Sequence, residues 1–176
     1  TPAAIELWNK IKKNTKYIYT PKDENEFSDY VKRRLDDDIK ERGIIVNREV
    51  EIRHGEGEAK GERTDIHVDA VMRNQCKEVY DSITVIIEAK GCWHPDLNHA
   101  MKTQLVDRYL KDNCCQHGLY LVGWFCCAQW DDNDYRKKRS QNISIDEARK
   151  QFNTQASELS QQSTRIKAFV INTALR

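Results

Sequence analysis

Residues 83–90 read Ile83-Thr84-Val85-Ile86-Ile87-Glu88-Ala89-Lys90, an apolar run that ends in two charged side chains. The run has the length and the β-branched composition of a buried strand. Because side chains alternate between the two faces of a strand, Glu88 and Lys90 project from the same face, two residues apart. A charge at the end of an apolar strand is costly unless it is paired or binds a ligand. The pattern therefore indicates a functional site at the end of this strand.

A second acid can reach the same place. The stretch Thr64-Asp65-Ile66-His67-Val68 predicts another strand, and a hairpin of the two strands would bring Asp65 to Glu88. Two carboxylates beside a lysine suit Mg²⁺ and the hydrolysis of a phosphate ester. Asp69 lies on the same face as Asp65 and is an alternative ligand. His67 lies between them, and we expect it to be a neighbour of the site because Mg²⁺ prefers oxygen ligands.

These residues resemble the PD-(D/E)XK nuclease superfamily, whose pattern is an acid, a variable gap, and then acid-x-lysine. Asp65 matches the first acid, Glu88 the second and Lys90 the lysine, and Thr64 stands where the proline of the name would be. The resemblance implies that Asp65, Glu88 and Lys90 are catalytic and converge in a cleft at one edge of a mixed sheet. It also implies that Mg²⁺, or Mn²⁺ in its place, binds Asp65, Glu88 and the backbone carbonyl of Ala89.

Many members of this superfamily add an acid from the first core helix. Glu24 falls on the apolar stripe of the predicted helix, one turn before Phe27, and is a further candidate metal ligand. An acid near the start of a helix is also favourable by itself, because it interacts with the helix dipole. Glu49 and Glu51, on the first predicted strand, are alternatives for the same role.

Several residues after the Glu-x-Lys strand are candidates for contacting nucleic acid or supporting the site. Trp93 could stack on a base, and packing in the core is the alternative. Some helicase-coupled exonucleases of the superfamily carry Gln-x-x-x-Tyr in the next helix. Here the spacing from Gln104 to Tyr109 is one residue longer, and Arg108 takes the fourth position. Gln104 and Arg108 could hold a DNA phosphate, whereas Tyr109 could belong to the core. The basic run at 136–139 is a further candidate for phosphate contacts.

The order of predicted elements agrees with the resemblance. Periodicity and capping signals predict helices, strands and one polar loop. The helices cover 4–13, 20–43, 95–112 and 144–162, the strands cover 44–53, 64–72, 83–89, 119–126 and 167–171, and the loop covers 131–142. The second helix is expected to begin at Thr20 as its N-cap. This is the restriction-endonuclease-like αβββαβ core of an α/β fold, a central mixed sheet flanked by helices. The resemblance covers about residues 20–126, and a C-terminal helix and strand extend it.

The composition limits the class of protein. The 176 residues suit one domain, 1–176, and a net charge of +1 with 32% charged residues gives no global basic field. Six cysteines include the vicinal pairs 114–115 and 126–127 without a Cys-x-x-Cys spacing, and reduced thiols are the simplest interpretation. A zinc or iron–sulfur site at these four cysteines is one alternative. A cysteine nucleophile paired with His117 is another.

Together these features predict a Mg²⁺-dependent deoxyribonuclease that hydrolyses phosphodiester bonds. The resemblance suggests a cytoplasmic role in restriction or anti-phage defence, as the effector domain of a larger protein, and the chain begins at Thr1 rather than at methionine. We expect DNA as a partner, no membrane, and a homodimer if both strands of a duplex are cut. The alternative is a catalytically silent domain of the same fold that binds nucleic acid or a partner protein.

Overall fold

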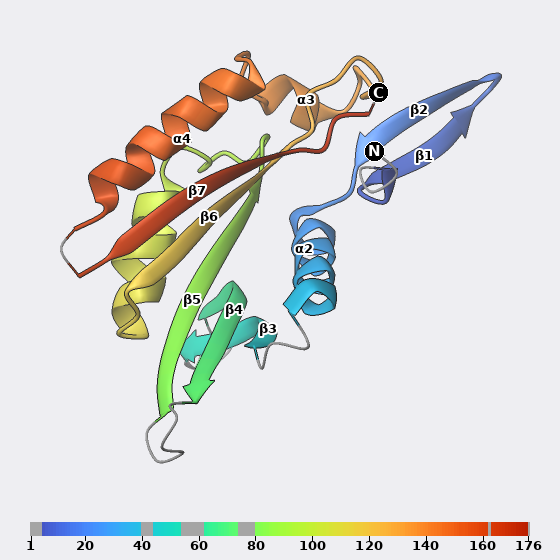
Figure 1. The fold of residues 1–176 in the computed structure, drawn as a ribbon. Helices are drawn as coiled ribbons and strands as arrows, with labels where there is room; N and C mark the ends of the chain where they lie inside the picture. The colour runs from blue at the N-terminus through green and yellow to red at the C-terminus, as the bar shows by residue number, and fades with distance from the viewer. Residues whose placement is uncertain (1–4, 40–43, 54–61, 74–79, 162, 176) are drawn as a thin grey trace.

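The structure is a computed structural model, and it describes residues 5–39, 44–53, 62–73, 80–161 and 163–175. Only the backbone is described at 49–53, 62–65, 71–73 and 80–81. Within these residues, five strands form a mixed central sheet (Figure 1). The strands lie side by side in chain order: β3 (Ile44–Arg53), β4 (Glu62–Arg73), β5 (Tyr80–Gly91), β6 (His117–Trp124) and β7 (Arg165–Asn172).

The strand pairing changes from antiparallel to parallel at β5. β3, β4 and β5 are antiparallel, whereas β5, β6 and β7 are parallel. Each parallel pair needs a crossover, and both crossovers carry helices. The mixed α/β architecture and the five strands expected from the sequence are therefore confirmed, with ends that differ by a few residues. β5 lies at the centre of the sheet and is the strand where the two kinds of pairing meet.

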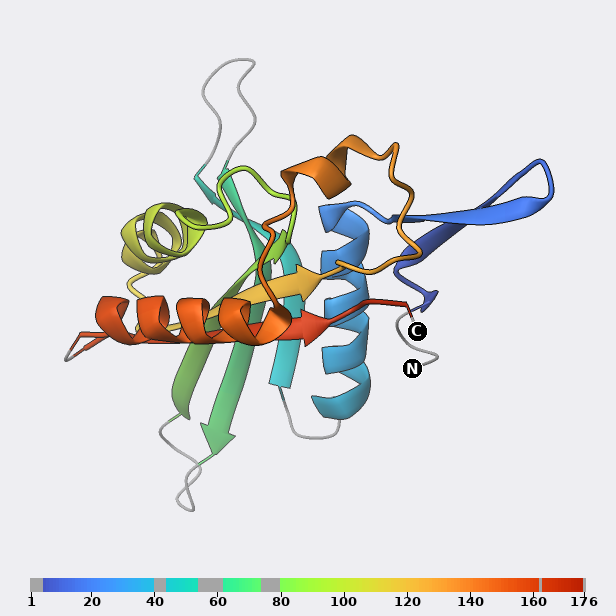
Figure 2. The ribbon, with the colours of Figure 1, turned by 90° about the horizontal axis from the view of Figure 1, so that it is seen from above.

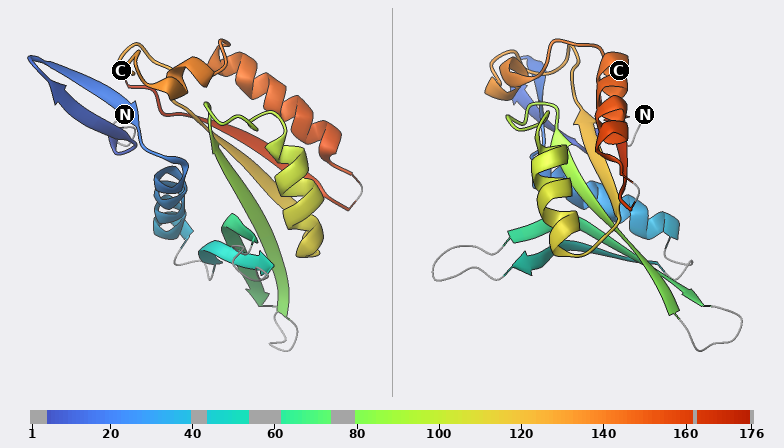
Figure 3. Two further views of the ribbon diagram at one scale, coloured as in Figure 1. Left: turned by 180° about the vertical axis from the view of Figure 1, so that it is seen from behind. Right: turned by 90° about the vertical axis from the view of Figure 1, so that its left-hand side faces the viewer.

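Helices cover both faces of the sheet (Figures 2 and 3). The helix α2 (Glu24–Ile39) packs on β3, β4 and β5. Figure 3 shows the π-helix η2 (Met101–Leu110) and the helix α4 (Ile145–Leu159) on the opposite face. The short helix α3 (Tyr135–Arg139) lies inside the segment that was expected to be a loop. In the part of the chain that the structure describes, no helix is both long and apolar enough to span a membrane.

Aromatic side chains close the core where the parallel strands end. Trp8, Trp93, Phe125 and Trp130 are buried in one cluster, and the ring centroids of its contacting pairs lie 4.9 to 6.1 Å apart. Phe27 of α2 joins the cluster, with its centroid 6.0 Å from that of Phe125. Aromatic pairs of this kind add about 0.5–1.5 kcal/mol each beyond the burial of their surface. The cluster therefore fixes the start of α2 against the ends of β5 and β6.

The N-terminal segment differs from the expectation. It forms a hairpin of β1 (Trp8–Lys13) and β2 (Lys16–Pro21) instead of the helix predicted over 4–13. Asn14 has a φ of 56° in the two-residue loop, a left-handed conformation that asparagine tolerates. The helix prediction failed because a short segment with few apolar residues fits helical and alternating patterns about equally well.

The N-cap of α2 is Asp23 and not Thr20, which lies in β2. Asp23 Oδ1 accepts a hydrogen bond from Glu26 N at 2.8 Å, and Glu26 Oε2 accepts one from Asp23 N at 3.2 Å. This reciprocal pair is a capping box, and it sets the first residue of the helix. The capping box predicted from Ser144 and Glu147 at the start of α4 is confirmed.

The core cluster leads to a prediction about stability. Phe27 is fully buried, so Phe27→Ala should lower the free energy of unfolding by about 3–5 kcal/mol, through lost burial and the cavity left behind. Phe169, on the edge strand β7, is 61% exposed and is the matched control. Phe169→Ala should change stability by no more than about 0.5 kcal/mol. Urea denaturation of both variants measures the difference, and equal losses would contradict this account of the core.

Candidate functional site

Glu88 and Lys90 form a buried ion pair at the end of β5. Lys90 Nζ lies 2.7 Å from Glu88 Oε1, and the lysine and glutamate side chains are 9% and 1% exposed, respectively. Their neighbours Ile86, Ile87 and Ala89 are also buried, so both faces of the strand are covered here. β5 is the third of the five described strands in the central sheet. The pair therefore lies on a central strand of the described sheet, as the apolar run from Ile83 to Ile87 predicts.

The ion pair lies on the face of the sheet that η2 and α4 cover. The parallel register places Glu88 beside Tyr120, and neighbours across two strands share a face. Tyr120 is buried, and its ring centroid lies 5.8 Å from that of Phe152 in α4. Its hydroxyl donates a hydrogen bond to Leu97 O at 2.7 Å. Because these groups exclude water, charge interactions here are stronger than at the protein surface.

The side chains of Glu24 and His94 meet just beyond Lys90. Glu24 Oε1, in the first turn of α2, accepts a hydrogen bond from Gly91 N at 2.9 Å, and Glu24 Oε2 lies 3.7 Å from His94 Nε2. His94 Nδ1 accepts a hydrogen bond from Asp96 N at 3.0 Å, so Nε2 carries the proton of the neutral ring. Burial and the charge of Lys90 lower the pKa of His94, against the opposing effect of Asp96. The ring is therefore neutral at pH 7 and faces Glu24.

The backbone of β4 brings residue 65 level with Glu88. Ile66 pairs with Ile87 in the antiparallel register, so the residue before Ile66 and the residue after Ile87 come next to each other along the two strands. The side chain of Asp65 itself lies outside the described residues. The strand pairing is thus the one that a shared site for Asp65 and Glu88 requires.

Asp69 lies too far along the sheet to share a metal ion with Glu88. It pairs with Thr84, whose hydroxyl donates a hydrogen bond to Asp69 Oδ1 at 2.7 Å. Thr84 precedes Glu88 by four residues of β5, which is about 13 Å at about 3.3 Å per residue. His67 Nε2 lies 3.2 Å from Asp69 Oδ1, so the side chain of His67 also interacts with Asp69. The alternative ligand considered from the sequence is therefore wrong.

The helix after β5 is a π-helix, which changes the relation between Gln104 and Tyr109. Hydrogen bonds in a π-helix join residues five apart, so Gln104 and Tyr109 lie one turn apart. The longer spacing in this chain therefore corresponds to the one-turn separation of Gln-x-x-x-Tyr in an α-helix. Tyr109 is buried and Gln104 half-buried, whereas Arg108 is exposed.

Trp93 is a core residue. It is 8% exposed, its ring packs on Phe125 and Trp130, and the guanidinium of Arg136 lies 5.2 Å above it. Little of the ring surface remains for a stacked base, so the structure favours the packing alternative. A surface pocket of about 390 Å³ adjoins Trp93 between the start of α2, the turn after β5 and α3; it is lined by Asp23, Glu24, Asn25, Trp93, His94, Pro95, Tyr135, Arg136 and Arg139.

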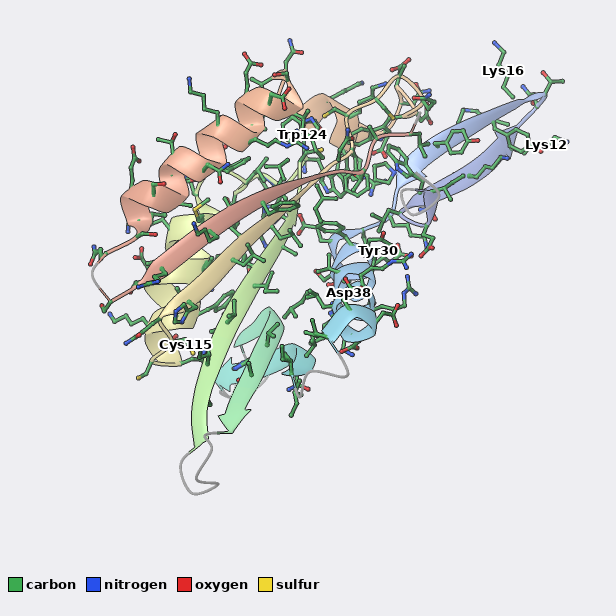
Figure 4. All side chains as sticks on the ribbon, in the orientation of Figure 1. Lys12, Lys16, Tyr30, Asp38, Cys115 and Trp124 are labelled. Atoms are coloured by element: carbon green, nitrogen blue, oxygen red, sulfur yellow. The ribbon has the colours of Figure 1, made fainter. Side chains whose placement is uncertain are left out.

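The two vicinal cysteine pairs lie at opposite ends of β6, so they cannot form one metal site. Figure 4 shows Cys115 before the strand and Trp124, which ends it, at the other end. Beyond Trp124, Cys126 Sγ lies 3.9 Å from Cys92 Sγ. Burial raises the pKa of the Cys115 thiol, which opposes a nucleophilic thiolate beside His117. Both cysteine alternatives therefore lack structural support.

The ion pair in β5 leads to a prediction about coupling. Lys90→Met leaves the carboxylate of Glu88 buried without its cation, and should destabilise the protein by about 3–5 kcal/mol. In the double variant with Glu88→Gln the two losses should not add, with a coupling of about 0.5–3 kcal/mol. The exposed pair Arg149 and Asp146, 2.9 Å apart in α4, is the control and should show little coupling. Additive losses at Glu88 and Lys90 in urea denaturation would contradict a stabilising contact between them.

Glu88 and Lys90 are ion-paired near the end of β5, and Glu24 of α2 contacts the same strand through Gly91 N. Comparison with protein-family models, curated proteins and solved structures finds no match for this chain. Among the described residues, no group of three or more His, Cys, Asp or Glu side chains could hold a metal ion. The side chains of Asp65, Glu49 and Glu51 are not among them.

Proposed function

We propose that this protein is a Mg²⁺-dependent nuclease that hydrolyses phosphodiester bonds in DNA. The observation that carries the proposal is the buried pair of Glu88 and Lys90 at the end of a central strand. In an ordinary core an apolar pair of similar volume would be at least as stable, so the buried charges call for another reason.

The residues present fit a hard divalent cation. Glu88 offers carboxylate oxygens, the backbone carbonyl of Ala89 lies next to it in the chain, and Glu24 comes to the same strand end from α2. Asp65, whose backbone lies level with Glu88, would complete an all-oxygen set of the kind that Mg²⁺ prefers. When bound, the ion would polarise a phosphoryl oxygen and supply a water of lowered pKa.

The side chains of the site would divide the remaining work. Lys90 is a fixed cation that would stabilise the negative charge that accumulates on the phosphoryl oxygens. Glu24 holds Gly91 N and so keeps the strand end in place. His94, neutral at pH 7, would donate a hydrogen bond through Nε2 without adding charge. Gln104 and Arg108, on η2, are proposed to contact a DNA phosphate, whereas Tyr109 is buried.

The order of elements supports the same proposal. A helix, three strands, a helix and a strand follow one another from α2 to β6, and this is the order of the restriction-endonuclease-like core. The resemblance of Asp65, Glu88 and Lys90 to the PD-(D/E)XK pattern is a further reason for proposing a nuclease. It suggests restriction or anti-phage defence as the setting, with further domains of a larger protein as partners.

The first test is cleavage. The protein should cut DNA with Mg²⁺ or Mn²⁺, chelator should abolish cutting, and Asp65→Asn and Glu88→Gln should each lower the rate by at least about 100-fold, because each would remove a metal ligand. Asp69→Asn is the matched control on the same strand as Asp65 and should cut like the wild type. A gel assay on labelled duplex DNA measures the rates, and equal cutting by all variants would overturn the mechanism.

The second readout of this test is metal binding without DNA. A cation that binds only the folded state raises the melting temperature. Mn²⁺ should therefore stabilise the wild type and Asp69→Asn, and should not stabilise Glu88→Gln. A wild type that neither cuts DNA nor responds to Mn²⁺ would favour the catalytically silent domain instead.

A further inference from the structure

The β1–β2 hairpin projects from the body of the molecule as a two-stranded ribbon (Figure 1). Among the described strands it pairs with none of the central sheet. Its base is fixed, because Trp8 is buried and donates a hydrogen bond from Nε1 to Thr173 O at 2.7 Å, and Asp131 N donates one to Tyr19 O at 2.8 Å. Every residue of β1 after Trp8 is exposed. A two-stranded ribbon is barely stable alone, so this anchoring is what holds it out in solvent.

The ribbon concentrates positive charge. Between Leu7 and Lys22 the chain has five lysines, counting Lys22, and no Asp or Glu. Lys13 lies directly opposite Lys16 as the last pair of the ribbon, and like charges in this position destabilise a strand pair. Figure 4 shows Lys12 and Lys16 extending into open space at the far end of the ribbon. An external anion would relieve this repulsion, and the structure describes no acidic partner for Lys12, Lys13 or Lys16.

The other basic run of the chain is different. In α3, Arg136 Nη2 lies 2.8 Å from Asp134 Oδ2, and Lys137 Nζ lies 2.7 Å from Asp132 Oδ1. Half of that run is therefore neutralised by neighbouring acids. The lysines at the end of the ribbon have no such compensation, so their field extends into solvent.

The size of the ribbon fits double-stranded DNA. Six residues in each strand give a length of about 20 Å at about 3.3 Å per residue. A two-stranded ribbon enters the major groove of B-DNA, which is about 12 Å wide, and phosphates recur about every 3.4 Å along each of its strands. Lys10 and Lys12 share one face of the ribbon, and Lys13 and Lys16 share the other. Both walls of a groove could therefore be contacted.

We propose that this ribbon binds double-stranded DNA and holds it against the site at the end of β5. β2 ends at Pro21, and Glu24, which bonds to Gly91 N, follows three residues later. The anchored base of the ribbon is thus joined directly to the candidate active site. The inference rests on the proposed function for the site and adds to it that the substrate is a duplex.

Duplex binding without metal tests the proposal. The wild type and the triple variant Lys12→Gln, Lys13→Gln, Lys16→Gln are titrated into a labelled duplex in chelator, so that nothing is cut, and followed by fluorescence anisotropy at several salt concentrations. We expect the variant to bind on the order of tenfold or more weakly at about 50 mM salt, and its salt slope to be shallower by about 0.9 for each phosphate that it no longer neutralises. The control is Lys111→Gln, Lys150→Gln, Lys167→Gln, which removes the same charge from exposed lysines outside the ribbon and should bind like the wild type.

The outcomes separate this proposal from the proposed function. Equal affinity of the wild type and the ribbon variant would overturn the proposal that the ribbon binds DNA, even if the wild type cuts DNA. If the protein binds DNA through the ribbon but never cuts it, the result would support DNA binding by the ribbon and count against the proposed nuclease activity. Tighter binding to duplex RNA than to duplex DNA would also overturn the proposal, as would an equal loss of affinity in the control variant. Aggregation of the ribbon variant with unchanged DNA affinity would assign the lysines to protecting the strand edges instead.

Discussion

The ion pair between Glu88 and Lys90 is the constraint to which the surrounding structure is fitted. Moving a carboxylate and an ammonium group out of water costs several kcal/mol for each ion, and a close contact offsets this cost only when the geometry is fixed. β5 supplies that geometry, because residues two apart on a strand share a face. The parallel partner β6 and the layer of η2 and α4 then exclude water from the same face. A strand at the edge of the sheet could not bury the pair in this way.

The start of α2 is built to reach the same strand end. The capping box of Asp23 and Glu26 fixes where the helix begins, and Glu24 is therefore held at the distance of a hydrogen bond from Gly91 N. Gly91 is needed at this position, since a Cβ there would come within 2.6 Å of the ring of Trp93. The same glycine thus lets the aromatic cluster cover the end of β5 and leaves its N–H facing Glu24. Packing and polar contacts therefore specify a single position for this carboxylate.

The elements that could be predicted from the sequence are those with a long and unambiguous pattern. The run from Ile83 to Ile87 is apolar and β-branched, so a central strand was the expected outcome. Ser144 and Glu147 predicted the start of a helix because both halves of a capping box are visible in the sequence. The position of Asp69, far from Glu88, depends on strand register, which one sequence does not reveal when both acids lie on the same face.

The features that could not be predicted depend on local backbone conformation. The hairpin requires Asn14 to adopt a positive φ, and the pattern Asn14-Thr15 is a weaker turn signal than Asn-Gly. The π-helix moves Tyr109 by one position relative to an α-helix, and no residue type marks that change.

Net charge was equally uninformative about the surface. The value of +1 averages the lysines of the ribbon with acids elsewhere, such as the run from Asp36 to Asp38 near the end of α2. Figure 4 places Asp38 well away from Lys12 and Lys16, so the two signs are separated in space. Association with a polyanion depends on the local field and not on the sum, because screening confines each charge to a range of about 10 Å at about 0.1 M salt. The hairpin gives a nearly neutral chain one strongly basic projection, and this projection ends at Pro21, three residues before Glu24, which bonds to the end of β5.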